Sequence, residues 1–239
     1  TITPSPSGGT RQKTDECAGV TTRREDRGGR LMGAPSQSET PTIHLHKGDL
    51  PDGLTFAGSV AVDSETQGLN LSRDRLCVVQ LSAGDGVCHL VQIAAGQTDA
   101  PNLRALMEDR TVVKIFHYAR FDIAALRRWL NIDCAPVYCT KIASKLVRTY
   151  TDGHGLKDVV RELAGVELDK QQQSSDWARA DLSPAQQGYA ANDVLYLHRV
   201  RAALDEMIAR EGRQDLLQAC FDFLPTRVAL DLGGWGEVD

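Results

Sequence analysis

The sequence of 239 residues lacks a long apolar run, and this absence limits where the protein can act. No apolar stretch reaches the roughly 18 residues of a candidate membrane span. The first residues contain neither the apolar segment nor the cleavage-like site of a secretory signal. We therefore expect no contact with membranes and a cytoplasmic location.

The sequence also lacks the motifs of several common enzyme classes. Neither G-x-G-x-x-G nor G-x-x-x-x-G-K-[ST] occurs, which disfavours a nucleotide-binding dehydrogenase and a P-loop enzyme. There is no C-x-x-C pair among the six cysteines, so we expect reduced core thiols rather than a zinc site or disulfides. These cysteines are Cys17, Cys77, Cys88, Cys134, Cys139 and Cys220.

The chain has no excess of positive charge, because its formal net charge is −5. Such a balance is unusual for a protein that binds nucleic acid. An enzyme that holds cations in its site is an exception, since its acidic ligands make the net charge negative while the metal supplies positive charge locally. The net charge therefore excludes neither a protein that does not bind nucleic acid nor a metal-dependent enzyme that does.

The N-terminal segment differs in composition from the rest of the chain. Residues 1–41 are rich in Gly, Ser, Thr and Pro and have no apolar period, which predicts a disordered or non-native extension. The apolar content of 41% is otherwise sufficient for a substantial core. We expect residues 42–239 to form one domain.

Hydrophobic patterning predicts an α/β fold with a mixed sheet. Apolar runs at 58–62, 76–81 and 87–93, separated by Gly, Asn and Asp, are typical of three antiparallel strands. After a helix at 101–109 come a strand at 112–116, a helix at 121–130 and a strand at 137–139, which form a βαβ unit. The remainder is predicted to be mostly helical, at 140–149, 156–164, 184–210 and 213–222.

Two carboxylates stand at the end of the first of these strands. Asp63 and Glu65 alternate along the chain and should share one face of the sheet. Their charges repel each other unless something positive lies between them. Taken alone, the pair is better explained as a solvated strand end that leads into the turn at Gln67 and Gly68.

Three further residues could meet this pair. Asp122 follows the strand at 112–116, and Tyr189 and Asp193 are four residues apart on a predicted helix, so they share a face. Taken singly, Asp122 is an ordinary helix-start residue and Asp193 an ordinary solvated one. The ordered set of Asp-x-Glu, Asp and Tyr-x-x-x-Asp favours a common site.

This set resembles the motifs of the DEDD 3′-to-5′ exonucleases in their tyrosine form. Residues 62–66 (VDSET), 114–126 (KIFHYARFDIAAL) and 189–193 (YAAND) are similar to the three motifs of that family. The resemblance covers about residues 42–239 and implies a ribonuclease H-like fold flanked by helices.

Further segments resemble the nanoRNase C group of alphaproteobacteria, which acts on very short RNA. They are LHKGDLP (45–51), RDRLCVVQLSAGDG (73–86), VYCTKIASKLVRTYTDGHGLKDVVREL (137–163), KQQQSSDW (170–177) and CFDFLPTRVALDL (220–232).

The resemblance implies a hydrolase that uses two divalent cations, Mg²⁺ or Mn²⁺. Asp63, Glu65 and Asp193 would hold one ion, Asp63 and Asp122 would serve the second, and the Tyr189 hydroxyl would orient water. Hard cations prefer oxygen ligands, which explains a site of carboxylates.

The resemblance also implies a substrate and an assembly. The substrate would be very short single-stranded RNA, with DNA a further possibility, converted to 5′-mononucleotides. The assembly would be a closed ring of eight subunits. The terminal nucleotide would meet Thr66, Gln67 and Leu69, while His117 and Tyr118 could reach phosphate or base. Ordinary packing explains these last two equally well.

Other features leave two explanations open. Five basic residues on two predicted helices could guide phosphates or form solvated faces: Lys141, Lys145, Arg148, Lys157 and Arg161. Trp177 is expected in the core rather than as a base-stacking platform.

Two other functions stay as alternatives. The first is a ribonuclease D-like enzyme that trims longer RNA; such enzymes usually carry additional helical domains, and only residues 194–239 follow Asp193 here. The second is a catalytically inactive nucleic-acid-binding module, which commonly lacks one of the carboxylates.

Overall fold

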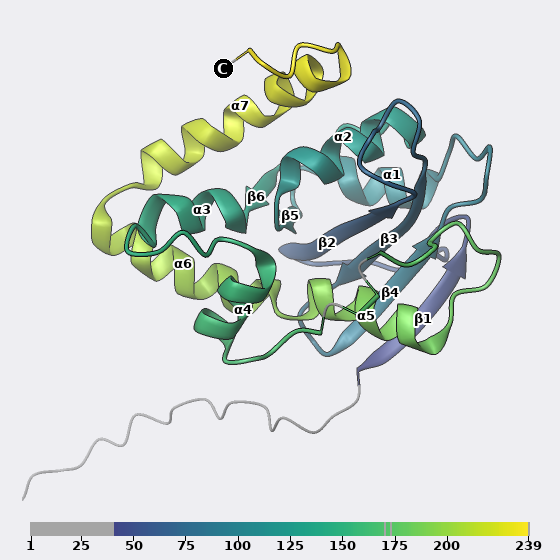
Figure 1. The fold of residues 1–239 in the computed structure, drawn as a ribbon, viewed down its shortest axis with the longest axis horizontal. Helices are drawn as coiled ribbons and strands as arrows, with labels where there is room; N and C mark the ends of the chain where they lie inside the picture. The colour runs from purple at the N-terminus through teal and green to yellow at the C-terminus, as the bar shows by residue number, and fades with distance from the viewer. Residues whose placement is uncertain (1–40, 170, 173, 239) are drawn as a thin grey trace, which may run out of the picture. The chain divides into compact units, whose positions relative to one another are not determined.

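The computed structural model contains a mixed β-sheet that spans the domain. Its description covers residues 41–169, 171–172 and 174–238, so the extension predicted over residues 1–41 lies, except for Pro41, outside the described residues. Six strands of the described part run in the order β1-β4-β3-β2-β5-β6 (Figure 1). They are Thr42–Lys47 (β1), Ser59–Thr66 (β2), Leu76–Ser82 (β3), Val87–Gln92 (β4), Val113–Phe116 (β5) and Val137–Cys139 (β6).

The pairing of the strands confirms the predicted mixed sheet. β2, β3 and β4 form the antiparallel part, and β5 and β6 continue the sheet in parallel from β2. The βαβ unit is formed by β5, α2 and β6. The helices are Pro101–Glu108 (α1), Ala119–Leu130 (α2), Thr140–Val147 (α3), Leu156–Ala164 (α4), Pro184–Leu195 (α5), Leu197–Glu211 (α6) and Gln214–Leu232 (α7).

Three elements differ from the sequence-based expectation. β1 was not predicted, although its alternation of apolar and polar residues suits an edge strand; it pairs in parallel with β4. The single helix expected over 184–210 is divided at Tyr196, which ends α5 and begins α6. The last helix continues through Pro225 to Leu232.

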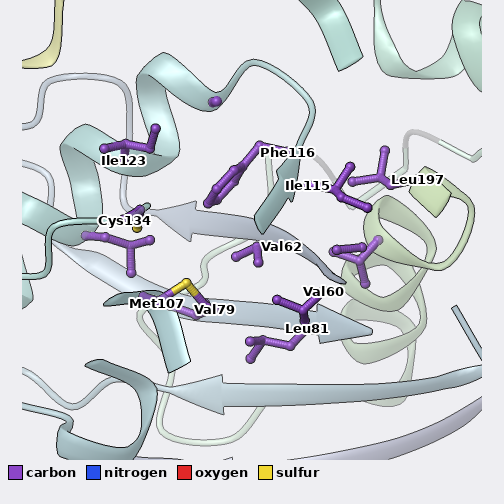
Figure 2. Packing of buried hydrophobic residues seen from close by; sticks show 14 of the residues in the cluster. Val60, Val62, Val79, Leu81, Met107, Ile115, Phe116, Ile123, Cys134 and Leu197 are labelled. Carbon is purple, nitrogen blue, oxygen red and sulfur yellow. The ribbon is translucent and has the colours of Figure 1, made fainter. Parts of the chain in front are cut away.

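The core lies between the sheet and the helices on each of its faces. Every residue of β3 is buried, as expected for a central strand covered on both sides. Figure 2 shows Val62 and Val79 of the sheet beside Met107 of α1 and Ile123 of α2. Full burial of such a side chain contributes about 1.5–3 kcal/mol. No helix of the described residues has the length and apolarity needed to cross a membrane.

Two basic residues are buried in the fold, and one of them changes the interpretation of the predicted basic patch. Arg148, which was placed in that patch, is only 1% exposed and pairs with Glu162. Lys114 is also fully buried, and its Nζ donates to the carbonyl oxygens of Asp109, Val112 and Ala135 at 2.6–2.7 Å. Both cations stabilise the fold, and Arg148 is not available to guide phosphates.

Candidate active site

The carboxylates of Asp63 and Glu65 come from the C-terminal half of β2. This strand is paired with β3 on one side and β5 on the other, which holds its backbone in place. Because side chains alternate along a strand, Asp63 and Glu65 point to the face opposite Val62 and Ser64. The regular register ends between Glu65 and Thr66, so the chain changes course directly after the second carboxylate.

Asp122 reaches the site from the other face of the sheet. It lies in the first turn of α2, where the helix dipole favours a negative charge. The hydroxyl of Ser64 donates to Asp122 Oδ1 at 2.6 Å, and both side chains are buried. Ser64 therefore connects β2 to α2 between the two acidic residues of the strand. The sequence reasoning missed it; its position between Asp63 and Glu65, facing the opposite side, was the available signal.

The N-terminus of α5 is built to hold this helix in one place. Ser183 and Gln186 form a capping box, in which each side chain accepts a hydrogen bond from the other's backbone N–H at 3.0–3.2 Å. The Gln186 amide also donates to the Ser175 hydroxyl at 2.7 Å and to the Asp176 carbonyl at 3.0 Å. The preceding loop is thus tied to the helix that carries the last two site residues.

α5 directs Tyr189 and Asp193 toward β2. Ala190 and Val194 are fully buried and seat the helix on the sheet. Tyr189 and Asp193, one turn apart, lie beside this apolar stripe and are half-buried. Burial raises the pKa of the Tyr189 phenol above its usual range, and the neighbouring Asp193 raises it further. Tyr189 therefore keeps its proton at neutral pH.

Three carboxylates converge at one point. One oxygen each from Asp63, Glu65 and Asp193 lies within 4.8 Å of the others. Asp122 is close enough to act on the charge of Asp63. Within the part of the chain that the structure describes, no Lys, Arg or His forms an ion pair with any of the four.

This concentration of negative charge disfavours ionisation of the four groups. Water reaches part of Asp63, Glu65 and Asp193, yet desolvation by the surrounding protein is the largest cause of each pKa shift. Burial, and then repulsion from Asp122, Asp193 and Glu65, raises the pKa of Asp63 well above its usual range. Burial and repulsion from Asp193 and Asp122 raise the pKa of Glu65 to about 9. Burial raises the pKa of Asp122 and of Asp193 to about 7.

The donor set fits a hard divalent cation. It consists of carboxylate oxygens, which Mg²⁺ and Mn²⁺ prefer, and it contains no imidazole or thiol. A bound cation would lower the raised pKa values, because an opposite charge favours the ionised form. The repulsion expected from the sequence is therefore present, and a cation is the partner that would relieve it.

Trp177 forms one wall beside the site tyrosine. Its ring centroid is 6.0 Å from that of Tyr189, with the ring planes tilted by 42°. Only 3% of Trp177 is exposed, which agrees with its expected place in the core. Trp177 restricts the orientation of the Tyr189 ring, a contact that spacing in the sequence does not reveal.

The loop after β2 carries the predicted contacts of the terminal nucleotide. Asp74 packs so closely against Gly68 that a Cβ there would lie 2.4 Å from its Oδ2, and the same carboxylate accepts from the Asn70 N–H. This loop presents Leu69, which is 86% exposed. The Thr66 hydroxyl donates within the loop to the Gly68 carbonyl, and Gln67 is exposed.

His117 and Tyr118 lie in different environments. Both ring nitrogens of His117 are engaged within the chain, Nδ1 with the Thr140 hydroxyl at 2.8 Å and Nε2 with the His154 carbonyl at 3.1 Å. Burial, followed by the charge of Lys141, lowers the pKa of His117 to about 3. Tyr118 is 45% exposed and adopts a left-handed backbone conformation before α2, with Lys141 Nζ 4.2 Å from its ring centre. Of the two residues, Tyr118 is free to meet a ligand.

A cleft of about 680 Å³ adjoins the first turn of α2. Its lining includes Leu69 and Tyr118 but none of the four carboxylates; of these, only Asp122 is adjacent in sequence to a lining residue, Phe121. Arg120 on α2 and Asp231 near the end of α7 close one side through two hydrogen bonds of 2.5 and 2.6 Å. The volume is in the range of pockets for small ligands.

Comparison with known proteins relates this arrangement to nucleases. A family model described as 3′-5′ exonuclease matches residues 49–209. Ribonuclease D of Acidiphilium cryptum is 37% identical over 166 residues, which cover 70% of this chain and 42% of that protein. Ribonuclease D of Gluconacetobacter diazotrophicus is 36% identical over 156 residues, 65% of this chain and 39% of that protein. The chain thus matches about two fifths of the length of these relatives.

Solved structures cover more of the chain. Brucella melitensis NrnC is 56% identical with a TM-score of 0.80, over 83% of this chain and 97% of that chain. Structures of the same protein with bound Mg²⁺ and bound to pGG are similar at 54% and 55% identity. Escherichia coli RNase D is 26% identical with a TM-score of 0.64, over 72% of this chain and 45% of that chain. This chain belongs to the 3′-5′ exonuclease family, and its relatives there include NrnC and ribonuclease D.

Proposed function

We propose that the protein is a metal-dependent 3′-5′ exoribonuclease that hydrolyses very short RNA, chiefly dinucleotides, to 5′-mononucleotides. The observation that carries this proposal is the convergence of Asp63, Glu65 and Asp193, with Asp122 close by and Tyr189 beside them. A catalytically inactive module gains nothing from four buried carboxylates, whose raised pKa values show that burial, and then mutual repulsion, disfavours their ionised forms.

The carboxylates would hold two divalent cations, Mg²⁺ or Mn²⁺. Asp63, Glu65 and Asp193 would bind one, and Asp63 would share the second with Asp122, which Ser64 holds in place. When bound, such a pair of cations activates water and stabilises the charge on the attacking and leaving oxygens of a phosphodiester.

Tyr189 would position the attacking water. Burial raises the pKa of this phenol in the metal-free protein, so it would serve as a hydrogen-bonding group rather than as a general base unless a bound cation lowers that pKa. The wall formed by Trp177 fixes the ring from which this hydroxyl extends.

Two features support a short substrate. The cleft adjoins the first turn of α2, which carries Asp122, and the Arg120–Asp231 ion pair bounds it on one side. The exposed Leu69 and Tyr118 on its lining would contact the nucleotides, with Thr66 and Gln67 nearby on the same loop. The similarity to NrnC, whose structure bound to pGG is known, fits a ligand of this length. Trimming of longer RNA, as by a ribonuclease D, remains the alternative.

We also propose a closed ring of subunits, eight by resemblance, in the cytoplasm. α7 buries one face against its own domain through Leu217, Phe221 and Leu224, yet leaves Leu216 and Phe223 53% and 45% exposed. These two residues are seven apart and therefore share a helix face. The free cysteines of the described residues suit a reducing compartment.

An end-labelled RNA series tests the substrate. Lengths from two to about twenty nucleotides, each 5′-phosphorylated, are incubated with the enzyme and Mg²⁺ or Mn²⁺, and initial rates are measured. We expect the dinucleotide to be the fastest substrate, because a cleft of this size accepts few nucleotides. Preferential trimming of twenty-mers would instead identify the ribonuclease D-like alternative.

The same series needs a variant that lacks the shared metal ligand. Asp63→Asn should abolish hydrolysis at every length, because it weakens both cation sites. Its metal-free melting temperature should equal or exceed that of the wild type, since one repelling charge is removed. Near-wild-type turnover of this variant would contradict the proposed site.

Tyr189→Phe separates positioning from binding. The change keeps the ring against Trp177 but removes the hydroxyl, so kcat should fall by roughly 10²-fold while KM changes little. Tyr196→Phe, two helical turns farther along, is the matched control and should retain wild-type kcat. An unchanged kcat with a raised KM in Tyr189→Phe would make this residue a substrate contact instead.

Thermal unfolding at different pH values tests the cation requirement without an activity assay. The carboxyls have pKa values of about 4 in the unfolded chain and of about 7 to 9 in the metal-free folded protein, so folding loses stability relative to the protonated state as pH rises from about 4 through 7 and 9. The difference in melting temperature between Mg²⁺ and EDTA should therefore widen from pH 6 to pH 9. Glu65→Gln should reduce this widening, whereas the exposed Glu206→Gln should not. A difference that is constant with pH would count against these carboxylates as ligands.

Light scattering tests the assembly. We expect a particle much larger than a dimer, and a smaller one for Leu216→Glu/Phe223→Glu, because charges would enter the proposed contact. Gln214→Glu/Gln218→Glu adds the same charge on another flank of α7 and should leave the assembly intact. A wild-type mass of about 26 kDa, the mass of one chain, would refute the ring.

A further inference from the structure

Three histidines form a cluster on the edge of the sheet, apart from the carboxylates. His44 and His46 alternate along β1 and therefore point to the same face. His89 on β4 stands in register with His44, so its side chain projects on that face as well. β1 is the edge strand, and β4 is its partner in the described sheet. A His-x-His strand and one histidine on the adjacent strand thus place three imidazoles together.

A hydrogen bond joins the nitrogens of two of these rings, at a separation that two ligands of one metal ion can also have. His46 Nε2 and His89 Nδ1 are 3.0 Å apart. Two nitrogens that each bind one ion at about 2.0–2.1 Å are separated by roughly 3.0–3.4 Å. The ring of His44 is centred 5.2 Å from that of His89 and 6.4 Å from that of His46. As placed, the three rings do not bring one nitrogen each within 4.8 Å of one another, so a shared ion requires a rotation of the exposed His44 side chain.

The protonation of the cluster suits a cation. Burial, and then repulsion between the imidazoles, lowers the pKa of His46 and of His89, although the Asp85 carboxylate opposes the shift for His89. Neutral imidazole is the form that binds a metal. At neutral pH each ring is thus neutral, with one N–H and one lone pair, and the hydrogen bond between the two rings uses one of each.

The ring arrangement alone has a simpler explanation, a stacked pair joined by one hydrogen bond. That hydrogen bond accounts for the facing nitrogens of His46 and His89, so the observation that points beyond it is the third imidazole, His44, on the same face. Stacking of a nucleobase on the cluster is disfavoured too, because Phe56 packs with its edge against His89, 5.9 Å between centroids.

We propose that His44, His46 and His89 form a site for a borderline divalent transition metal such as Zn²⁺. Imidazole nitrogens suit Zn²⁺, Cu²⁺ and Ni²⁺, whereas the carboxylates near β2 suit Mg²⁺ and Mn²⁺. The two sites therefore select different ions. A metal ion bound by histidines of both strands would cross-link β1, at the edge of the sheet, to β4. The site does not depend on the proposed nuclease activity.

Calorimetric titration with Zn²⁺ tests the site in full-length protein without a histidine tag. Excess Mg²⁺ and the Asp63→Asn background suppress Zn²⁺ binding at the carboxylates. We expect one equivalent of Zn²⁺ to bind, with affinity at least about tenfold weaker in His46→Gln and in His89→Gln. Gln keeps a hydrogen-bonding side chain of similar size but is a poor ligand. Thr42→Ala, on the same face of β1, is the control and should bind Zn²⁺ like the parent.

A second measurement guards against variants that fold poorly. Zn²⁺ should raise the melting temperature of the parent, because it binds only the folded strands, and should raise it less in His44→Ala, whose side chain is exposed. Absence of Zn²⁺ binding in the parent overturns the proposal. Binding that is unchanged in all three histidine variants overturns it as well. Neither result bears on the nuclease, since the background is already inactive by design.

Discussion

Repulsion among carboxylates is the constraint on which the site depends. Asp63 and Glu65 are held on one face of β2, Asp193 approaches from α5, and Asp122 comes from α2 on the opposite face. Left to themselves, like charges separate or take up protons. The backbone pairing of β2 with β3 and β5 and the seating of α5 on the sheet prevent the separation. The favourable free energy of this pairing and packing therefore offsets the repulsion among the carboxylates.

Small contacts around the carboxylates decide how accurately they are held. Ser64 joins the strand to α2, Gln186 joins α5 to the preceding loop, and Trp177 limits the ring of Tyr189. None of these residues belongs to the set proposed to bind cations. They fix the positions of the four acidic side chains relative to one another, because a preorganised site needs supporting residues that are themselves held in place.

The parts of the site that follow local rules could be predicted from the sequence. Alternation places Asp63 with Glu65, and four-residue spacing places Tyr189 with Asp193; the strand-helix order also yields the mixed sheet. What could not be predicted depends on contacts between distant segments, such as Arg120 with Asp231. Arg148 appeared to be a surface charge because its helix has basic neighbours, yet its partner Glu162 comes from another helix.

The order of the strands has a consequence for how the protein folds. β1 pairs with β4, and β2 pairs with β5, in each case across intervening elements of the chain. Such non-local pairings form late and slowly, because loop closure must precede any gain from contact. The carboxylates of β2, α2 and α5 are likewise far apart in the sequence and come together only when the whole fold has formed. A nascent or partly folded chain therefore lacks the assembled carboxylate site until its domain is complete.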